Sequence, residues 1–361
     1  MKPITPINIP AKGFTIVELM VAATLGLIIL AGAISMFVSN KRIYTEQEEM
    51  SRLQENARFA MTMIIQDLRM AGYSGCSGAP DQVNNNINGN TDPTDLFFYE
   101  PLEGSEAATN WEPSNSSEQV ASMLANTDGV TVRYFEPTDV HVMNPALTPA
   151  SNQIHISAES GLQQGDAVGI SDCGSLDAVV ITAAPSTSGC GAGTQSTGPT
   201  DAYKTTITHN AGTPPAGAEP GNANATLSKA YSEEAEILRY VTHRYYVGND
   251  ANGAPMLFRQ SGFNQVDAMV EGVENLQVMY GEDTAGNDAI ADTYVAANAV
   301  SNWDDVVSVR VSILVRSIEE YGVDTDTKTY SLLGTDVGPL NDRRRRRVFT
   351  ATVDVRNRSL Q

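Results

Sequence analysis

The sequence lacks the signatures of the common enzyme classes. Its 361 residues contain no His-Glu-x-x-His pair, no Gly-x-Ser-x-Gly elbow and no phosphate-cradling loop that ends in Gly-Lys. The four histidines, His141, His155, His209 and His243, are scattered along the chain, which is typical of surface or packing residues. We therefore expect a structural or binding protein that needs no cofactor, rather than an enzyme.

Positive charge is scarce. The chain has 23 Lys and Arg against 43 Asp and Glu, a formal net charge of −20. Such a surface repels nucleic acid, so we expect no nucleic-acid partner. Five consecutive arginines at 343–347 suggest binding to nucleic acid or lipid phosphate. In a strand they would alternate between two sides, and pairing with acids of the same protein or of a neighbouring subunit fits the overall charge better.

Proline is absent from residues 14–71, and charge is absent from residues 19–40. The uncharged apolar run is long enough, as a helix, to cross a hydrocarbon core of about 30 Å. Glu18 is the exception, and a carboxylate at the edge of such a segment costs about 2.5–3.5 kcal/mol unless it finds a partner. The pattern predicts a membrane helix, which an ordinary signal anchor with a stray Glu would also have.

Helical periodicity continues beyond the apolar run. One stripe of apolar residues recurs every three or four positions: Met50, Leu53, Ala57, Ala60, Met61, Ile64, Leu68 and Ala71. Charged side chains, Asp67 among them, lie mostly off that stripe. We expect one helix of roughly 58 residues that ends at Gly72 and Gly75 and packs on a sheet. Pairing of residues 41–71 with another helix, as a coiled coil, is the alternative.

Residues 1–13 do not have the pattern of an ordinary secretory signal. They contain three prolines, no apolar core and no small-residue cleavage site. Lys2 and Lys12 favour retention of this end in the cytoplasm, so the C-terminal mass is expected to be exported. Loss of both lysines with the leader would take the formal charge to about −22.

A family resemblance begins at Gly13, followed by Phe14, Thr15, Ile16, Val17 and Glu18. This segment resembles the class III signal of type IV prepilins. The resemblance implies that a prepilin peptidase cuts after Gly13 and that Phe14 is then N-methylated. It also implies that Glu18 neutralises the α-amine of Phe14 on a neighbouring subunit, since a buried acid needs a cation.

Residues 51–60 and 67–76 are similar to the PilW-type minor pilins, and residues 303–317 and 343–358 look like the C-terminal part of that family. The resemblance implies an α+β pilin-like fold, with a long N-terminal helix packed on an antiparallel β-rich domain. The expected divisions are a leader (1–13), a transmembrane and assembly helix (14–40), an amphipathic helix (41–72) and an exported domain with long loops (73–361).

The same resemblance implies a minor pilin that primes pilus assembly at or near the tip. Its partners would be other minor pilins, the major pilin, the prepilin peptidase and the assembly platform. The protein would sit in the inner membrane with a periplasmic domain, and then on the pilus. Two alternatives are a minor pseudopilin of a type II secretion system and a tip adhesin, the latter suggested by size and long polar loops.

Period-two patterns predict the strands. Val307, Val309, Val311, Ile313 and Val315 alternate with mostly polar residues. A second C-terminal strand is predicted over 348–355. Further strands are expected at 95–100, 129–135, 165–171, 178–183, 204–208, 236–247, 256–260 and 273–280.

The three cysteines lie in the part that we expect to be exported, where disulfides persist. If 165–171 and 178–183 form a hairpin, Cys173 lies at its tip and Cys190 past the opposite end. This arrangement favours a bond between Cys76 and Cys173, with Cys190 as the alternative partner.

An acidic loop is the one candidate metal site. Asp283, Asn287, Asp288 and Asp292 place oxygen ligands around Gly286, as a calcium loop does. Ala285 occupies a position where an acid would be expected, and no Glu closes a twelve-residue frame. Calcium binding and a solvated acidic turn both remain open.

Overall fold

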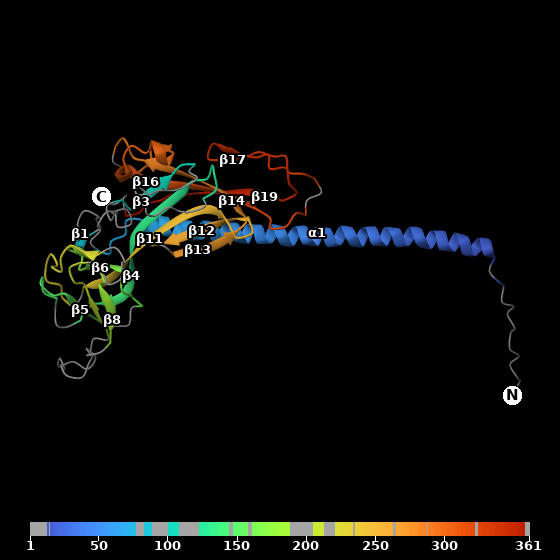
Figure 1. The fold of residues 1–361 in the computed structure, drawn as a ribbon. Coiled ribbons are helices and arrows are strands. Elements are labelled where there is room, and N and C mark those ends of the chain that lie inside the picture. Colours follow the sequence, from blue (N-terminus) through green and yellow to red (C-terminus); the bar gives the residue numbers. More distant parts are fainter. Residues whose placement is uncertain are drawn as a thin grey trace, which may run out of the picture.

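The residues that the structure describes form one long helix and five β-sheets. The computed structural model describes residues 13, 15–76, 83–88, 100–107, 123–143, 147–157, 161–187, 205–212, 221–233, 235–262, 265–286, 288–321 and 324–357. Helix α1 (Ile16–Met70) projects from one side of a β-rich domain (Figure 1). Its 55 residues correspond to a length of about 82 Å. The predicted helix is confirmed, and Phe14 lies outside the described residues.

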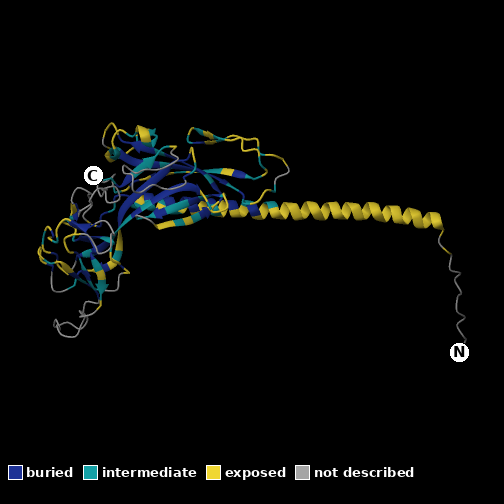
Figure 2. Ribbon diagram, in the orientation of Figure 1, coloured by how far each residue is buried: buried dark blue, intermediate teal, exposed yellow. Residues whose placement is uncertain are grey.

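The first half of α1 is exposed and the second half is buried on one side (Figure 2). The buried residues are Glu49, Leu53, Ala57, Ala60, Met61, Ile64 and Leu68. All of them except Glu49 are apolar and belong to the predicted stripe, and these six pack in one core with residues of two sheets of the same chain. The stripe is therefore covered by strands, and the coiled-coil alternative is wrong for it.

An eight-stranded sheet carries most of the domain. Strand β11 (Glu236–Asn249) is its centre, because it pairs with β4 on one side and with both β12 and β6 on the other. The other strands are β1 (Val83–Asn85), β3 (Leu102–Ser105), β4 (Gly129–His141), β6 (Ala167–Ser171), β7 (Leu176–Val180), β12 (Pro255–Ser261) and β13 (Gln265–Glu271). All pairs are antiparallel except β1 with β7.

A four-stranded antiparallel sheet forms the second wall of the core. Its order is β15 (Thr293–Val295), β14 (Val273–Glu282), β16 (Val306–Arg316) and β19 (Arg346–Asp354). A short hairpin, β17 (Tyr330–Leu332) with β18 (Thr335–Val337), lies between β16 and β19 in the chain. The 3₁₀ helices η3 (Ala297–Ala299) and η4 (Trp303–Asp305) precede β16.

A distal lobe lies at the end of the domain farthest from the exposed half of α1 (Figure 1). It has its own apolar core, drawn from residues 140–237. A three-stranded sheet belongs to it: β5 (Gln153–Ile156), β9 (Thr205–Thr208) and β8 (Ala183–Ser186). A second small sheet pairs β10 (Gly221–Asn222) with β2 (Ile87–Asn88).

The end of α1 is fixed by contacts to β4 and to the residues that follow β19. Gly72 and Gly75 have positive φ angles of 74° and 73°, which the absence of a side chain permits. The backbone N–H of Gly72 donates to the carbonyl of Arg133 on β4 at 2.9 Å. The Asn357 side-chain amide, after β19, donates to the carbonyls of Met70 and Ala71 at 3.3 and 3.0 Å.

Most predicted strands are confirmed, but one has the wrong bounds and several strands were not predicted. The predicted strand at 178–183 is wrong in its bounds, because β7 ends at Val180 and β8 begins at Ala183. The predicted strand at 95–100 falls outside the described residues except for its last position. Eight strands of two to four residues each were not predicted: β1, β2, β3, β5, β10, β15, β17 and β18. Strand β13 was not predicted either; it is an edge strand in which only Val270 is buried.

Replacing Ile64 tests the packing of the helix stripe. Ile64 is fully buried in the main core, so we expect Ile64→Ala to lower the free energy of unfolding of the domain by about 2–5 kcal/mol. The control is Phe59→Ala on the same helix, where the side chain is 54% exposed and the expected loss is below about 1 kcal/mol. Denaturant titration of the full chain in detergent measures both. Equal losses would contradict the packing.

Candidate functional site

The N-terminal half of α1 is an exposed apolar rod. Its large apolar side chains, from Ile16 at 81% to Ile43 at 49%, are all exposed in the monomer. An 18-residue window has a mean hydropathy of 2.4 and contains no buried residue. By length and composition this helix can cross a membrane, and it fits a membrane-anchored protein. In water such a surface would need to be covered.

Glu18 stands in the first turn of this rod. Thr15 begins the helix as its N-cap, and its hydroxyl oxygen accepts the backbone N–H of Glu18 at 3.2 Å. Within the described part of the chain, the Glu18 carboxylate has no ion-pair partner, and it is exposed. Gly13 precedes the helix. The arrangement leaves an acid at the edge of the apolar segment, where a cation from outside this chain would stabilise it.

Asp67 joins the helix to the eight-stranded sheet. Its Oδ2 lies 2.6 Å from His243 Nδ1 and accepts the hydroxyl of Tyr245 at 2.6 Å, while its Oδ1 accepts the hydroxyl of Tyr134 at 3.1 Å. Tyr134 lies on β4, and His243 and Tyr245 lie on β11. The Asp67 side chain is 13% exposed, so these bonds replace most of its hydration.

The contacts of Asp67 favour its charged form. Burial alone would raise the pKa of Asp67, but the hydrogen bond and charge of His243, with the two tyrosine hydroxyls, lower it overall. Burial and the Asp67 charge raise the pKa of both tyrosines, which therefore remain protonated donors. The sequence placed Asp67 on the polar face of the helix and gave no sign of this junction. His243, which was predicted to be a surface or packing residue, is half-buried and bonds to Asp67.

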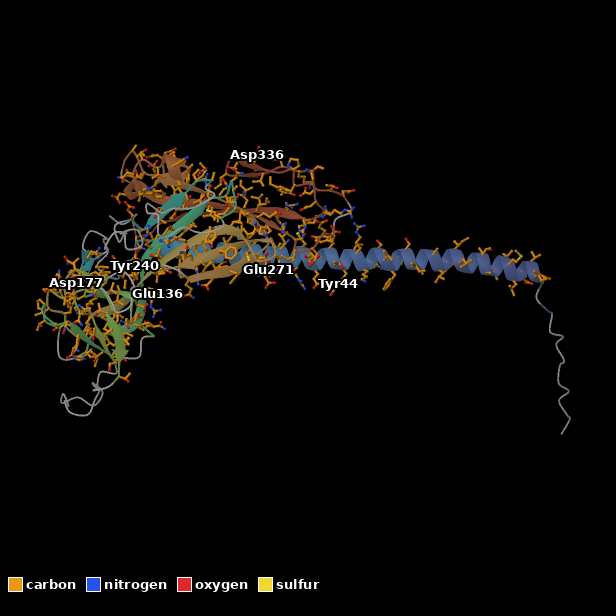
Figure 3. The ribbon with its side chains drawn as sticks, viewed as in Figure 1. Tyr44, Glu136, Asp177, Tyr240, Glu271 and Asp336 are labelled. Carbon is orange, nitrogen blue, oxygen red and sulfur yellow. A yellow bond between two sulfur atoms is a disulfide. The ribbon has the colours of Figure 1, made fainter. Side chains whose placement is uncertain are left out.

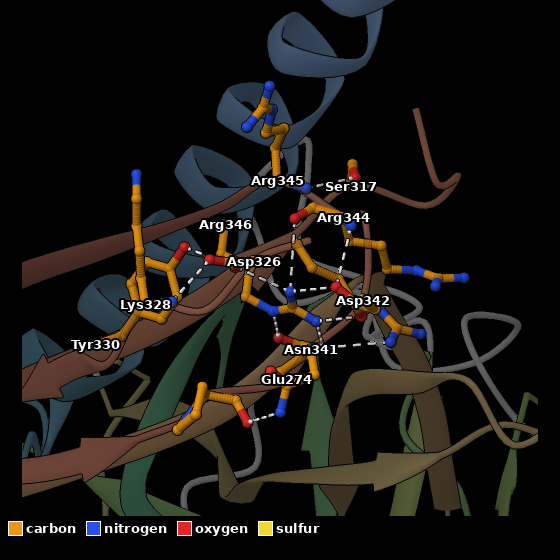
Figure 4. Close-up of polar contacts among 12 residues, drawn as sticks. Glu274, Ser317, Asp326, Lys328, Tyr330, Asn341, Asp342, Arg344, Arg345 and Arg346 are labelled. Atoms are coloured by element: carbon orange, nitrogen blue, oxygen red, sulfur yellow. Dashed lines mark hydrogen bonds and ion pairs between the residues drawn. The ribbon is translucent and has the colours of Figure 1, made fainter. Parts of the chain in front are cut away.

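Arg346 holds the segment that follows β16 against the four-stranded sheet (Figure 4). Its side chain is 1% exposed and forms ion pairs with Glu274 at 2.6 Å, Asp326 at 3.1 Å and Asp342 at 2.6 Å. Burial opposes the charge, but the hydrogen bonds and charges of Asp342 and Glu274 raise the pKa of Arg346 overall. The hydrogen bond from Arg346, more than any other cause, lowers the pKa of Asp342.

The neighbouring arginines also contact their own chain. Arg344 pairs with Glu320 at 2.9 Å, and Arg345 pairs with Glu46 of α1 at 3.1 Å. The Arg347 guanidinium lies 5.6 Å from the centre of the Phe349 ring. The prediction that this run pairs with acids of the same protein is confirmed for Arg344, Arg345 and Arg346.

The structure joins Cys76 to Cys173 by a disulfide, with the Cα atoms 4.5 Å apart. Cys173 lies in the turn between β6 and β7, and Cys76 lies six residues after α1. The bond therefore ties the end of the helix to the β6–β7 hairpin, across 97 positions of sequence. Cys190 lies outside the described residues.

The carboxylates of the acidic loop face the backbone of the loop itself. They accept backbone N–H groups at 2.7–3.0 Å: Asp292 from Thr284 and Ala285, Asp283 from Ala289, and Asp288 from Ile290. Asn287 lies outside the described residues. Among the residues that the structure describes, no three His, Cys, Asp or Glu side chains are grouped as a metal site. Calcium binding here stays a prediction.

Comparisons with known proteins match the two ends of the chain. Residues 244–357 match the family model described as Type IV Pilus-assembly protein W, and residues 10–34 match the prokaryotic N-terminal methylation motif. The pilin-like protein PilA3 of Thermus thermophilus is 34% identical over 61 residues, 17% of this chain and 26% of that protein. The chain thus spans about a quarter of this curated relative. No solved structure matches.

Replacing Asp67 by Asn tests the helix junction. An amide cannot accept all three hydrogen bonds, so we expect Asp67→Asn to lower the free energy of unfolding near neutral pH by about 1–3 kcal/mol. The pKa of Asp67 is lowered in the folded state from 3.8. Its stabilisation is therefore fully present above about pH 4 and is lost as the pH falls through the lowered pKa.

The difference in unfolding free energy between wild type and Asp67→Asn should accordingly narrow below about pH 4. Asp354→Asn, at an exposed carboxylate, is the control and should show no such pH dependence. Denaturant titrations at several pH values measure both. A difference that stays constant into the acid range would count against the role of the Asp67 charge.

Replacing Arg346 tests the buried ion cluster. Arg346→Met leaves Asp326 and Asp342 without their cation and Glu274 with Arg316 alone. We therefore expect a loss of about 3–5 kcal/mol in unfolding free energy and faster proteolysis within residues 317–345. Arg347→Met, at the exposed neighbour, should cost about 1 kcal/mol or less. Thermal unfolding and limited proteolysis compare the two. Equal effects at both positions would show that the cluster adds no stability.

Proposed function

We propose that the chain is a type IV pilus pilin of the PilW type, a minor pilin that primes assembly of the pilus. One observation carries the proposal. A single helix has an exposed apolar half, with one acid in its first turn, and a half buried in the domain. The apolar half suits a bilayer before assembly and a bundle of pilin helices afterwards.

The proposed route begins in the inner membrane, with the domain in the periplasm. A prepilin peptidase cuts after Gly13 and the new N-terminus at Phe14 is methylated. Glu18 then attracts the α-amine of Phe14 on a neighbouring subunit, because each charge alone is costly in an apolar environment. A few minor pilins associate in this way on the assembly platform, at or near the future tip, and the major pilin adds to them.

The role is structural rather than catalytic. The match of residues 244–357 to the pilus-assembly family model supports the pilus over the alternative of a secretion pseudopilin. Binding of a receptor at the tip would be an additional property of the distal lobe, which is farthest from the exposed half of α1 (Figure 1).

Replacing Glu18 tests the proposal. Glu18→Ala removes the charge that attracts the neighbouring α-amine, so we expect normal cleavage and membrane insertion but at least about tenfold less of the protein in sheared pili. Immunoblots of sheared fibres and the intact mass of the mature chain measure the two. The control is Glu55→Ala, at an exposed acid of the same helix. Wild-type levels of the Glu18 variant in fibres would refute the proposal.

A further inference from the structure

Two carboxyl groups and a tyrosine hydroxyl lie together where the end of β3 meets β14. We call Glu106, Asp128 and Tyr280 the acid site. Asp128 is 2% exposed and Tyr280 is fully buried, and Glu106 is half-buried with its Oε2 out of contact with solvent. Because β3 belongs to the eight-stranded sheet and β14 to the four-stranded sheet, the acid site lies at a junction of the two sheets.

Asp128 bridges the two sheets through backbone hydrogen bonds. Its Oδ1 accepts the N–H of Ala107, shortly after β3, at 3.0 Å, and its Oδ2 accepts the N–H of Val278 on β14 at 2.9 Å. Glu106 directly precedes Ala107, so its backbone lies beside the Asp128 carboxylate. A change in the charge of Asp128 therefore acts on the contact between β3 and β14.

Two oxygen atoms of the acid site have no hydrogen-bond partner in the described part of the chain: Glu106 Oε2 and the Tyr280 hydroxyl. The hydroxyl lies against β3, because a Cβ atom at Gly104 would be 2.2 Å from it. Buried polar atoms are normally paired, and each unpaired one lowers the stability of the fold. A proton bound within the acid site would give Glu106 Oε2 the donor that it lacks.

The chain supplies no basic residue from the segments that build the acid site. Residues 70–132 and 260–309, which contain all three members, have no Lys, Arg or His. Arg133, at the end of the first segment, already pairs with Glu103 at 2.6 Å and donates to the carbonyl of Glu100 at 2.9 Å. Two charged carboxylates would therefore lie close together without a counter-ion, and burial makes that arrangement costly.

The titration of all three groups is shifted toward the uncharged form. Burial raises the pKa of Asp128 from 3.8 to about 6, although two backbone hydrogen bonds oppose the shift, and the charge of Glu106 adds to it. Burial also raises the pKa of Glu106 against a hydrogen bond from the Ala297 backbone. Burial and the neighbouring acids raise the pKa of Tyr280, which therefore stays protonated.

We propose that the acid site takes up one proton in mild acid, and that Asp128 then donates it in a hydrogen bond to Glu106 Oε2. The proton comes from the solvent and converts the Asp128 carboxylate into a carboxylic acid. One negative charge then remains in place of two, shared by a coupled pair. The hydrogen bond fastens the end of β3 to β14 through Asp128.

This proton makes the junction of the two sheets sensitive to pH. The folded chain binds it more tightly than the unfolded chain, because the pKa of Asp128 is raised from 3.8 to about 6 by folding. The acid site therefore favours folding more as the pH falls from about 7 to about 4. The junction lies within the domain, so it acts whether or not the chain enters a pilus, and the Glu18→Ala experiment leaves it untouched.

Replacing Glu106 by Gln tests the shared proton. The amide keeps an oxygen for the Ala297 N–H and removes one charge. At pH 8 we expect the ratio of folded to unfolded chain to be at least about tenfold higher than in wild type, the equivalent of one pKa unit, and at pH 5 within about threefold. Denaturant titration of the full chain in detergent measures the ratio. No gain at pH 8, or an equal gain at both pH values, would overturn the proposal.

An exposed acid provides the control. Glu271→Gln, at the end of edge strand β13 (Figure 3), removes the same charge from a solvated position. We expect its ratio of folded to unfolded chain to differ from that of wild type by the same factor at both pH values. A gain at pH 8 as large as that of Glu106→Gln would show that the overall negative charge, rather than the acid site, is the cause.

Calcium separates a bound proton from a bound metal ion. Wild type and Glu106→Gln are titrated at pH 8 with calcium chloride and with EDTA. We expect calcium to change the ratio of folded to unfolded chain by the same factor in both proteins, because a proton neutralises the acid site. Stabilisation by calcium that is confined to wild type would overturn the proposal, since a cation would then bind Glu106.

Discussion

Burial of one stripe of α1 against strands of both large sheets is the contact on which the rest of the structure depends. Leu53, Ala57, Ile64 and Leu68 have almost no exposed surface, and the two sheets meet around them in a single core. The helix is therefore part of the domain over its second half and a free rod over its first half. A helix that emerges from a core in this way transmits any pull on its apolar end straight to the sheets, since it has no hinge within Ile16–Met70.

Polar contacts fix both ends of the buried half of α1 to the domain. Asp67 fixes the deep end of the buried half to β4 and β11, and the pair of Glu46 with Arg345 fixes the end near the apolar rod. Arg346, beside it, gathers three acids that would otherwise repel one another. In this acidic protein, His243 and Arg345 thus link the helix to the domain through Asp67 and Glu46.

Sequence patterns predicted those elements that depend on residues close together in the chain. The long helix, the stripe from Leu53 to Leu68 and the alternation along β16 follow from periodicity over neighbouring residues. The Asp67 junction could not be predicted, because His243 and Tyr245 lie more than 170 positions away in sequence. The sequence predicted that the arginines pair with acids, but not with which ones, since Glu274 is 72 positions from Arg346. Strand β13 was missed because an exposed edge strand has no alternating burial to reveal it.

The distal lobe departs from β4 and returns through β11 at directly opposed positions, His141 and Glu236. Its entry and exit are therefore about 5 Å apart, the distance between paired strands. Strands β6 and β7 and Cys173 lie between them, so this part of the chain is also held to β11 and, through the disulfide, to the end of α1. The sheet of β5, β8 and β9 takes no part in these bonds, so changes confined to it would leave the attachment of the lobe to the helix intact.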